Sequence, residues 1–249
     1  FLSVLVSTQH GYASEPEAVF NSTTSKREAD WLGDRLERHF SLQEWSVPPG
    51  SWSKRETANF LVYLEGASND ELDKVTQACE SCLSTFSSDR PQATFSTDWR
   101  PKCVVVLHRT PDSYDGTLGR RAGRSWGGTT IQRSGGRITS RRIDICATTP
   151  KRLAATFPHE LAHVILADCF GAQAPPLWLD EGLAVLAEPS HKLARRVRSL
   201  RGESGGVPFL GSVELFTAGQ YPNGQRQDAF YVESAELVHL LLVQGGLQD

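Results

Sequence analysis

The chain has 249 residues, of which 39% are hydrophobic and 22% are charged, and its net charge is -3. This composition is typical of a globular protein with one sizeable core. The weak negative charge argues against a nucleic-acid-binding protein, and no apolar stretch is long enough for a transmembrane span. The oligomeric state stays open.

The N-terminal part is expected to lie outside the main domain. The opening FLSVLVSTQHGYAS resembles the end of a signal peptide, with Gly11 and Ala13 at the small-residue positions of a cleavage site. We interpret residues 1–13 as a signal-peptide remnant and expect a secreted or extracytoplasmic protein; a short buried strand is the alternative. Residues 14–56 are polar and form an arm of uncertain structure. The main domain is expected over 57–249, truncated at its C-terminus.

The pattern becomes regular from Ala58 onwards. A strand is predicted over 59–65, followed by a helix that Asn69 caps and that runs to Phe86. Residues 102–108 form a continuous apolar strand, suited to the interior of a sheet. A short helix or turn is expected over 111–120.

The next segments turn from strands to helices. Strands are predicted over 126–133 and 141–147, joined through Gly135 and Gly136. Helices are expected at 177–188, 191–200 and 225–244. This order indicates an α+β fold, in which a small mixed or antiparallel sheet precedes a helical subdomain and the active-site helix lies at the junction.

The helix at that junction carries two prolines. Thr149 and Pro150 form a cap and first-turn pair that begins it. Pro158 is expected to break or kink this helix, because proline lacks the backbone donor and clashes with the preceding turn. A new helical run would then begin from a cap near Thr156.

Five cysteines neither demand nor exclude disulfides. Cys79 and Cys82 form a C-x-x-C on a predicted helix without a second such pair. We interpret them as exposed or half-buried thiols; a redox or metal role is the alternative. Cys103 and Cys146 each lie on a predicted strand. They could form a disulfide if those strands are neighbours.

The motif HELAH contains His159, Glu160 and His163. At about 100° per residue, all three side chains lie on one face of a helix. Two imidazoles one turn apart can bind a tetrahedral zinc ion, and Glu160 can reach a water on that ion. The alternative is a solvated helix face with incidental histidines.

A third ligand is available in WLDEGLA. Catalytic zinc sites usually have three protein ligands and one open position. Glu181 lies eighteen residues after His163, in the first turn of a further predicted helix. The alternative is that Asp180 and Glu181 only complement the helix dipole.

HELAH followed by WLDEGLA resembles the gluzincin metallopeptidases, in particular the compact peptidase MA-like domains, and more distantly zinc aminopeptidases and thermolysin. The resemblance covers Phe157 to Glu188 closely and Ala58 to Gln244 loosely. It implies a zincin-like fold, one zinc ion held by His159, His163 and Glu181, and Glu160 as the general base. The aminopeptidase G-x-M-E-N strand is absent, which disfavours an aminopeptidase.

The resemblance also extends to the last predicted helix. FYVESAELVHLL is similar to the Y-x-x-S segment of the MA-like domains, which implies Tyr231 as a catalytic phenol that stabilises the oxyanion. Tyr221 is the second candidate. The alternative for Tyr231 is a core tyrosine with a satisfied hydroxyl.

Together these features predict a zinc metallopeptidase that cleaves a peptide or protein substrate with metal-activated water. The alternatives are a zinc-binding interaction domain without proteolysis, a hydrolase of a non-peptide amide, and an adhesion module in which the motif is accidental.

The segment 120–142 contains seven arginines and no acidic residue. It forms either a solvated surface or a site of attraction for an acidic peptide or polyanionic polymer. One of the two strands in or beside it could pair with an extended substrate.

Overall fold

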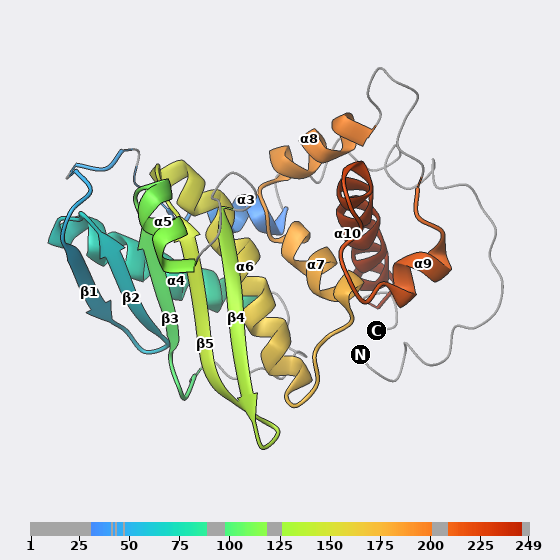
Figure 1. Ribbon diagram of the computed structural model, residues 1–249, viewed down its shortest axis with the longest axis horizontal. Helices are drawn as coiled ribbons and strands as arrows, with labels where there is room; N and C mark the ends of the chain where they lie inside the picture. Colours follow the sequence, from blue (N-terminus) through green and yellow to red (C-terminus); the bar gives the residue numbers. More distant parts are fainter. Residues whose placement is uncertain are drawn as a thin grey trace.

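The computed structural model describes residues 31–40, 42, 44–46, 48–88, 98–118, 126–200 and 209–245. The expected signal-peptide remnant, residues 1–13, lies outside this part. Five strands form one mixed sheet, and helices pack on it and beside it (Figure 1). This arrangement confirms the α+β class, with the sheet first and a helical half after it.

The sheet contains β1 (Trp52–Glu56), β2 (Phe60–Glu65), β3 (Cys103–His108), β4 (Gly127–Ser134) and β5 (Arg137–Cys146), in the order β1-β2-β3-β5-β4. The three inner strands are parallel, and each edge strand is antiparallel to its neighbour. β3 lies at the centre, as its apolar run predicts. Gly135 and Gly136 have φ of 56° and 73°, which suits the tight turn of the β4–β5 hairpin.

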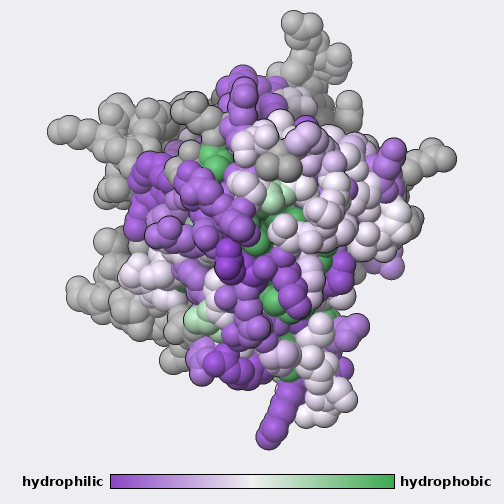
Figure 2. Space-filling model, turned by 90° about the vertical axis from the view of Figure 1, so that its left-hand side faces the viewer, coloured by the Kyte–Doolittle hydropathy of each residue, from purple (hydrophilic) through white to green (hydrophobic). Residues whose placement is uncertain are grey.

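Two elements come from the segment 14–56, to which no structure was assigned. β1 pairs with β2, so the sheet begins before the domain start expected at residue 57. β1 carries Lys54, Arg55 and Glu56, and charged side chains protect an edge strand from unwanted pairing. The face on this side of the molecule is mostly hydrophilic, with small separate hydrophobic spots (Figure 2). The second element is the short helix α3 (Leu32–Glu37), which packs against α6 and α4.

The two faces of the sheet are covered differently. α4 (Asn69–Ser88) and α6 (Pro150–Phe170) pack on one face, while the short α5 (Pro111–Leu118) lies at the other (Figure 1). α4 is capped by Ser68 rather than by Asn69. The backbone N–H of Ser68 donates to the Glu71 carboxylate at 2.8 Å, and the Glu71 N–H donates to the Ser68 hydroxyl at 3.3 Å. This is a capping box, whose signature includes the glutamate three residues later.

Pro158 does not end a helix, so the expected break near Thr156 is wrong. α6 is continuous from Pro150 to Phe170, with Thr149 as its N-cap and Pro158 inside it. Proline removes one helical hydrogen bond, but α6 buries most of its residues and the packing of such a helix outweighs that loss. The ammonium of Lys192 also donates to the Ala155 carbonyl, in the turn before the proline, at 2.9 Å.

The helical half consists of α7 (Leu177–Leu186), α8 (Ser190–Leu200), α9 (Ser212–Thr217) and α10 (Gln225–Gly245), beside the β4 edge of the sheet (Figure 1). α7 packs between α6 and α10. The described part of the chain has no helix that is both long and apolar enough for a bilayer.

The possible disulfide between Cys103 and Cys146 is excluded by the strand register, although the two strands are neighbours. β3 and β5 are neighbours, but Cys103 pairs in register with Arg141 and Cys146 pairs with His108. The two cysteines therefore lie at opposite ends of the strand pair, roughly 16 Å apart at 3.3 Å per residue, beyond the reach of a disulfide. None of the five cysteines forms a disulfide in the described part of the chain, and Cys79 and Cys82 are buried rather than exposed or half-buried.

The arginine-rich segment is not one solvated face. Arg120, Arg121 and Arg124 lie outside the described residues. Of the others, Arg141 is buried and forms an ion pair with Asp168 of α6, below the ring of Trp99. Arg133 donates to the Gly171 carbonyl, Arg142 pairs with Asp144, and Arg137 is exposed. Three of the arginines thus have internal partners.

Candidate metal centre

The side chains of His159, His163 and Glu181 meet at one point between α6 and α7. One ligand atom from each lies within 4.8 Å of the other two. The two imidazole Nε2 atoms are 3.3 Å apart. Oε2 of Glu181 is 3.7 Å from Nε2 of His159, and Oε1 is 3.9 Å from Nε2 of His163. Both rings therefore present the same nitrogen to the same carboxylate.

Local sequence explains how α7 brings Glu181 to this point. Pro175 and Pro176 precede α7 and separate it from α6, so the chain can turn between the two helices. Trp178 and Leu183 are buried and anchor the helix in the core. Gly182 allows α10 to approach, because a Cβ there would overlap the backbone carbonyl of Ser234 and lie 2.6 Å from Cγ2 of Val238.

A further carboxylate lies next to Nδ1 of each histidine, on the side of the ring away from Glu181. Nδ1 of His163 is 2.8 Å from Oδ1 of Asp180, and Nδ1 of His159 is 3.1 Å from Oε1 of Glu188. A carboxylate in this position can orient an imidazole so that its Nε2 faces a metal ion. Asp180 therefore does more than complement the helix dipole.

These acidic groups make the site favourable for a cation. Burial alone would lower the pKa of His163, but the Asp180 and Glu181 carboxylates outweigh it and raise that pKa to about 10. Burial would likewise raise the pKa of Glu188, yet contacts with His159, Arg196 and Lys192 hold it well below its usual range. Glu188 is thus an anion at neutral pH.

Glu160 lies between α6 and β4. Oε2 of its carboxylate accepts a hydrogen bond from the Thr129 hydroxyl at 2.8 Å, and the same hydroxyl is 3.0 Å from the Glu160 carbonyl. Gly127 makes room for this side chain, because a Cβ there would lie 2.5 Å from Oε1 of Glu160. Glu160 is 6% exposed, and the Thr129 contact ties its carboxylate to the edge strand β4.

The two candidate tyrosines lie side by side, with ring centroids 6.3 Å apart. The Tyr221 hydroxyl donates a hydrogen bond to Oε1 of Glu181. The Tyr231 hydroxyl accepts one from the Gln227 amide at 3.1 Å. Burial and the nearby Glu181 carboxylate raise the pKa of Tyr221 strongly and that of Tyr231 to about 12. Both phenols keep their proton at neutral pH, and Tyr221 makes the direct contact with the histidine–glutamate cluster.

The N-terminal helix α3 supports Glu188 from outside. The Trp31 indole donates to the Glu188 carbonyl at 2.9 Å, and Asp34 accepts from the Ser190 backbone at 2.8 Å. Gly33 packs so closely that a Cβ there would overlap the same carbonyl. Helix α3, which comes from the segment expected to be an N-terminal arm, thus packs against the junction of α7 and α8 and stabilises it.

Sequence reasoning missed several of these groups. Glu188 follows Glu181 by seven residues, close to two helical turns, so periodicity along the helix predicted over 177–188 could have placed both on one face, although α7 itself ends at Leu186. Thr129 and Arg196 carry no local signal, because their contacts come from β4 and α8. Ser234, three residues after Tyr231 in the Y-x-x-S segment, is fully buried where α10 meets α7.

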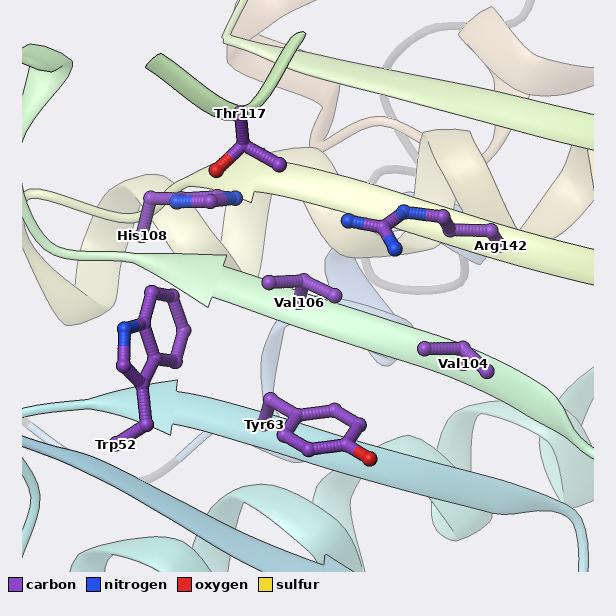
Figure 3. A pocket seen from close by; sticks show the side chains of 7 residues that line it. All are labelled: Trp52, Tyr63, Val104, Val106, His108, Thr117 and Arg142. Atoms are coloured by element: carbon purple, nitrogen blue, oxygen red, sulfur yellow. The ribbon is translucent and has the colours of Figure 1, made fainter. Parts of the chain in front are cut away.

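A separate hollow of about 380 Å³ lies on the opposite face of the sheet (Figure 3). Trp52, Tyr63 and Val106 line it from three neighbouring strands. Its arginine, Arg142, is already paired with Asp144. The hollow shares no residue with the histidine–glutamate cluster.

The donor set and its spacing fit a zinc ion. Two nitrogens at 2.0–2.1 Å from a tetrahedral ion lie about 3.3–3.4 Å apart, and the two Nε2 atoms are separated by 3.3 Å. Oε2 of Glu181 is buried and has no hydrogen-bond partner among the described residues. A buried carboxylate oxygen without a partner is costly, and a cation would satisfy it.

Comparisons with known proteins add no further information, since no family model, no curated protein and no solved structure matches the chain. The candidate metal centre therefore rests on its residues and their geometry.

Proposed function

We propose that this protein is a zinc-dependent peptide hydrolase with a zincin-like fold, in which His159, His163 and Glu181 hold one zinc ion. The observation that carries the proposal is the convergence of the two Nε2 atoms and the Glu181 carboxylate from separate helices. The resemblance of HELAH and WLDEGLA to the gluzincins supports it independently of the geometry.

A zinc ion held by His159, His163 and Glu181 would supply Lewis-acid chemistry, acidifying a water molecule and polarising a carbonyl group. Glu160 is the candidate general base, which would accept a proton from water and donate it to the leaving amine. Thr129 occupies one lone pair on Oε2 of this carboxylate. The other oxygen, Oε1, lies beside Gly127, where any larger residue would place a Cβ 2.5 Å from it.

The phenols supply hydrogen-bond donors for the oxygen that becomes negatively charged. Protonated tyrosine is suited to this role because it donates without adding charge. Tyr221 contacts Glu181 directly and Tyr231 lies beside it. We therefore assign the oxyanion role to this pair, with Tyr221 the nearer group.

Glu160→Gln tests the proposal. We expect turnover of a casein or peptide-library substrate to fall by at least about 100-fold, the contribution of a general base, while the variant still binds zinc. His159→Ala should lose both zinc and turnover. Glu44→Gln, a change at an exposed glutamate, is the matched control and should retain both.

The outcomes separate the competing functions. Wild-type protein that binds zinc but cleaves no peptide would favour an interaction domain or a hydrolase of another amide. Full activity in Glu160→Gln would remove Glu160 as the base. Absence of zinc binding after chelation and readdition would overturn the whole assignment.

A further inference from the structure

Two cations from α8 neutralise the carboxylate behind His159. Glu188 is 2% exposed. One guanidinium nitrogen of Arg196 lies 3.0 Å and 3.1 Å from its two oxygens, and the Lys192 ammonium lies 3.4 Å from Oε1. A buried carboxylate needs such partners to remain charged. The charge that orients His159 therefore depends on α8.

Arg196 also reaches the candidate phenol. Its guanidinium carbon lies 4.7 Å from the centroid of the Tyr231 ring. A second nitrogen of the group is 3.8 Å from the Asp228 carboxylate on α10. Lys192 differs, because its other contact is the Ala155 carbonyl of α6. Arg196 thus joins the α7–α8 junction to α10.

The shape of the guanidinium explains why one side chain can make both contacts. It is planar, so its edge can donate to a carboxylate while its face lies over an aromatic ring. An ammonium is a point charge without such a face.

Building on the proposed zinc site, we propose that Arg196 is a positioning residue that holds the Glu188 carboxylate against His159 and the Tyr231 ring beside the metal. Arg196 touches neither zinc nor substrate in this role. It acts through Glu188 on the orientation of the metal ligand, and through the ring on the placement of the phenol.

The effect of Arg196 on the metal ligand His159 can be tested without measuring activity. The measurement is the zinc affinity of the full chain, determined by competition with a chelating dye. Residues that orient a metal ligand from behind typically contribute about 10–100-fold in affinity. We expect Arg196→Ala to bind Zn²⁺ about tenfold more weakly than wild type. Arg195→Ala removes an exposed arginine from the same helix and should leave the affinity unchanged.

Two further variants separate positioning from general stability. Arg196→Met removes the guanidinium but keeps the apolar stem, so its zinc affinity should fall as far as in Arg196→Ala while its free energy of unfolding falls less. Arg196→Met therefore replaces Arg196→Ala in the test if Arg196→Ala does not fold. In Arg196→Lys the restored charge should recover part of the zinc affinity. At saturating zinc, kcat should stay below the wild-type value because the ammonium has no planar face for Tyr231.

A double variant tests whether Arg196 affects zinc affinity through Glu188. If Arg196 acts through Glu188, then Glu188→Gln and Glu188→Gln/Arg196→Ala should have nearly the same zinc affinity. Equal affinities in Arg196→Ala, Arg196→Met and Arg195→Ala would overturn the positioning role while leaving the zinc site intact. Failure of the unaltered protein to bind Zn²⁺ would overturn the proposed function and this role together.

Discussion

Replacing Gly182 with alanine should destabilise the protein, although the same change inside a helix is ordinarily stabilising. Gly182 lies in the interior of α7. An added Cβ would overlap the carbonyl oxygen of Ser234 and lie 2.6 Å from Cγ2 of Val238. Both atoms belong to α10, and one is backbone, so a change of rotamer cannot relieve the contact. α10 has to move away from α7.

The two opposing effects differ in size. Alanine gains about 1 kcal/mol over glycine from helix propensity. Overpacking a well-packed core costs about 1–3 kcal/mol, and overlap with a backbone carbonyl places this case at the upper end. We expect the free energy of unfolding to fall by about 2 kcal/mol. Since Glu181 precedes Gly182 directly, zinc affinity should fall as well.

Urea denaturation of the zinc-free protein measures the first effect. Gly116→Ala is the matched control: Gly116 lies in α5, and an added Cβ there meets nothing within 4 Å. This control should stabilise the protein by up to about 1 kcal/mol. The reasoning is refuted if Gly182→Ala is as stable as wild type, because the α7–α10 approach would then leave room for a methyl group.

Three further predictions concern other parts of the molecule. Thr129→Val removes the hydroxyl that holds Glu160, so kcat should fall while zinc affinity is unchanged; an unchanged kcat would show that Glu160 needs no such support. Asp168→Asn leaves the buried guanidinium of Arg141 without its anion, and urea denaturation should show a loss of about 3 kcal/mol; a loss below 1 kcal/mol would contradict the burial of this pair. Burial raises the pKa of Glu233 from 4.5 to about 7. The folded carboxyl thus holds its proton more tightly than the unfolded one, and stability should decline as pH rises from about 4.5 to about 7. Denaturation midpoints across this range should vary less in Glu233→Gln, and identical profiles would contradict the prediction.

Local sequence predicted features that depend on neighbouring residues. Helical periodicity placed His159, Glu160 and His163 on one face, and the apolar run of β3 predicted a central strand. The Thr149–Pro150 pair marked the start of α6 correctly. The prediction of a break at Pro158 was wrong because it considered only the hydrogen bond that proline removes from a helix. It left out the stabilisation that α6 gains by packing on the sheet.

Longer-range features could not be read from local patterns. The proposed Cys103–Cys146 bridge required neighbouring strands, which are present, but also a register that only the parallel pairing of β3 and β5 decides. The arginine-rich segment gave no sign that Arg141 would enter the core, because its partner Asp168 lies on α6.

The sequence by itself determined which side chains share a helix face and which residues offer ligand chemistry, because covalent geometry repeats these relations every turn. Only the tertiary structure decided that Glu181 reaches the imidazoles, that Glu188 and Asp180 stand behind them, and that Tyr221 is the nearer phenol. These contacts join α6 to α7 and to the segment before α10. Packing between those elements sets the distances between these side chains. Those distances cannot be read from the spacing of the residues along the chain.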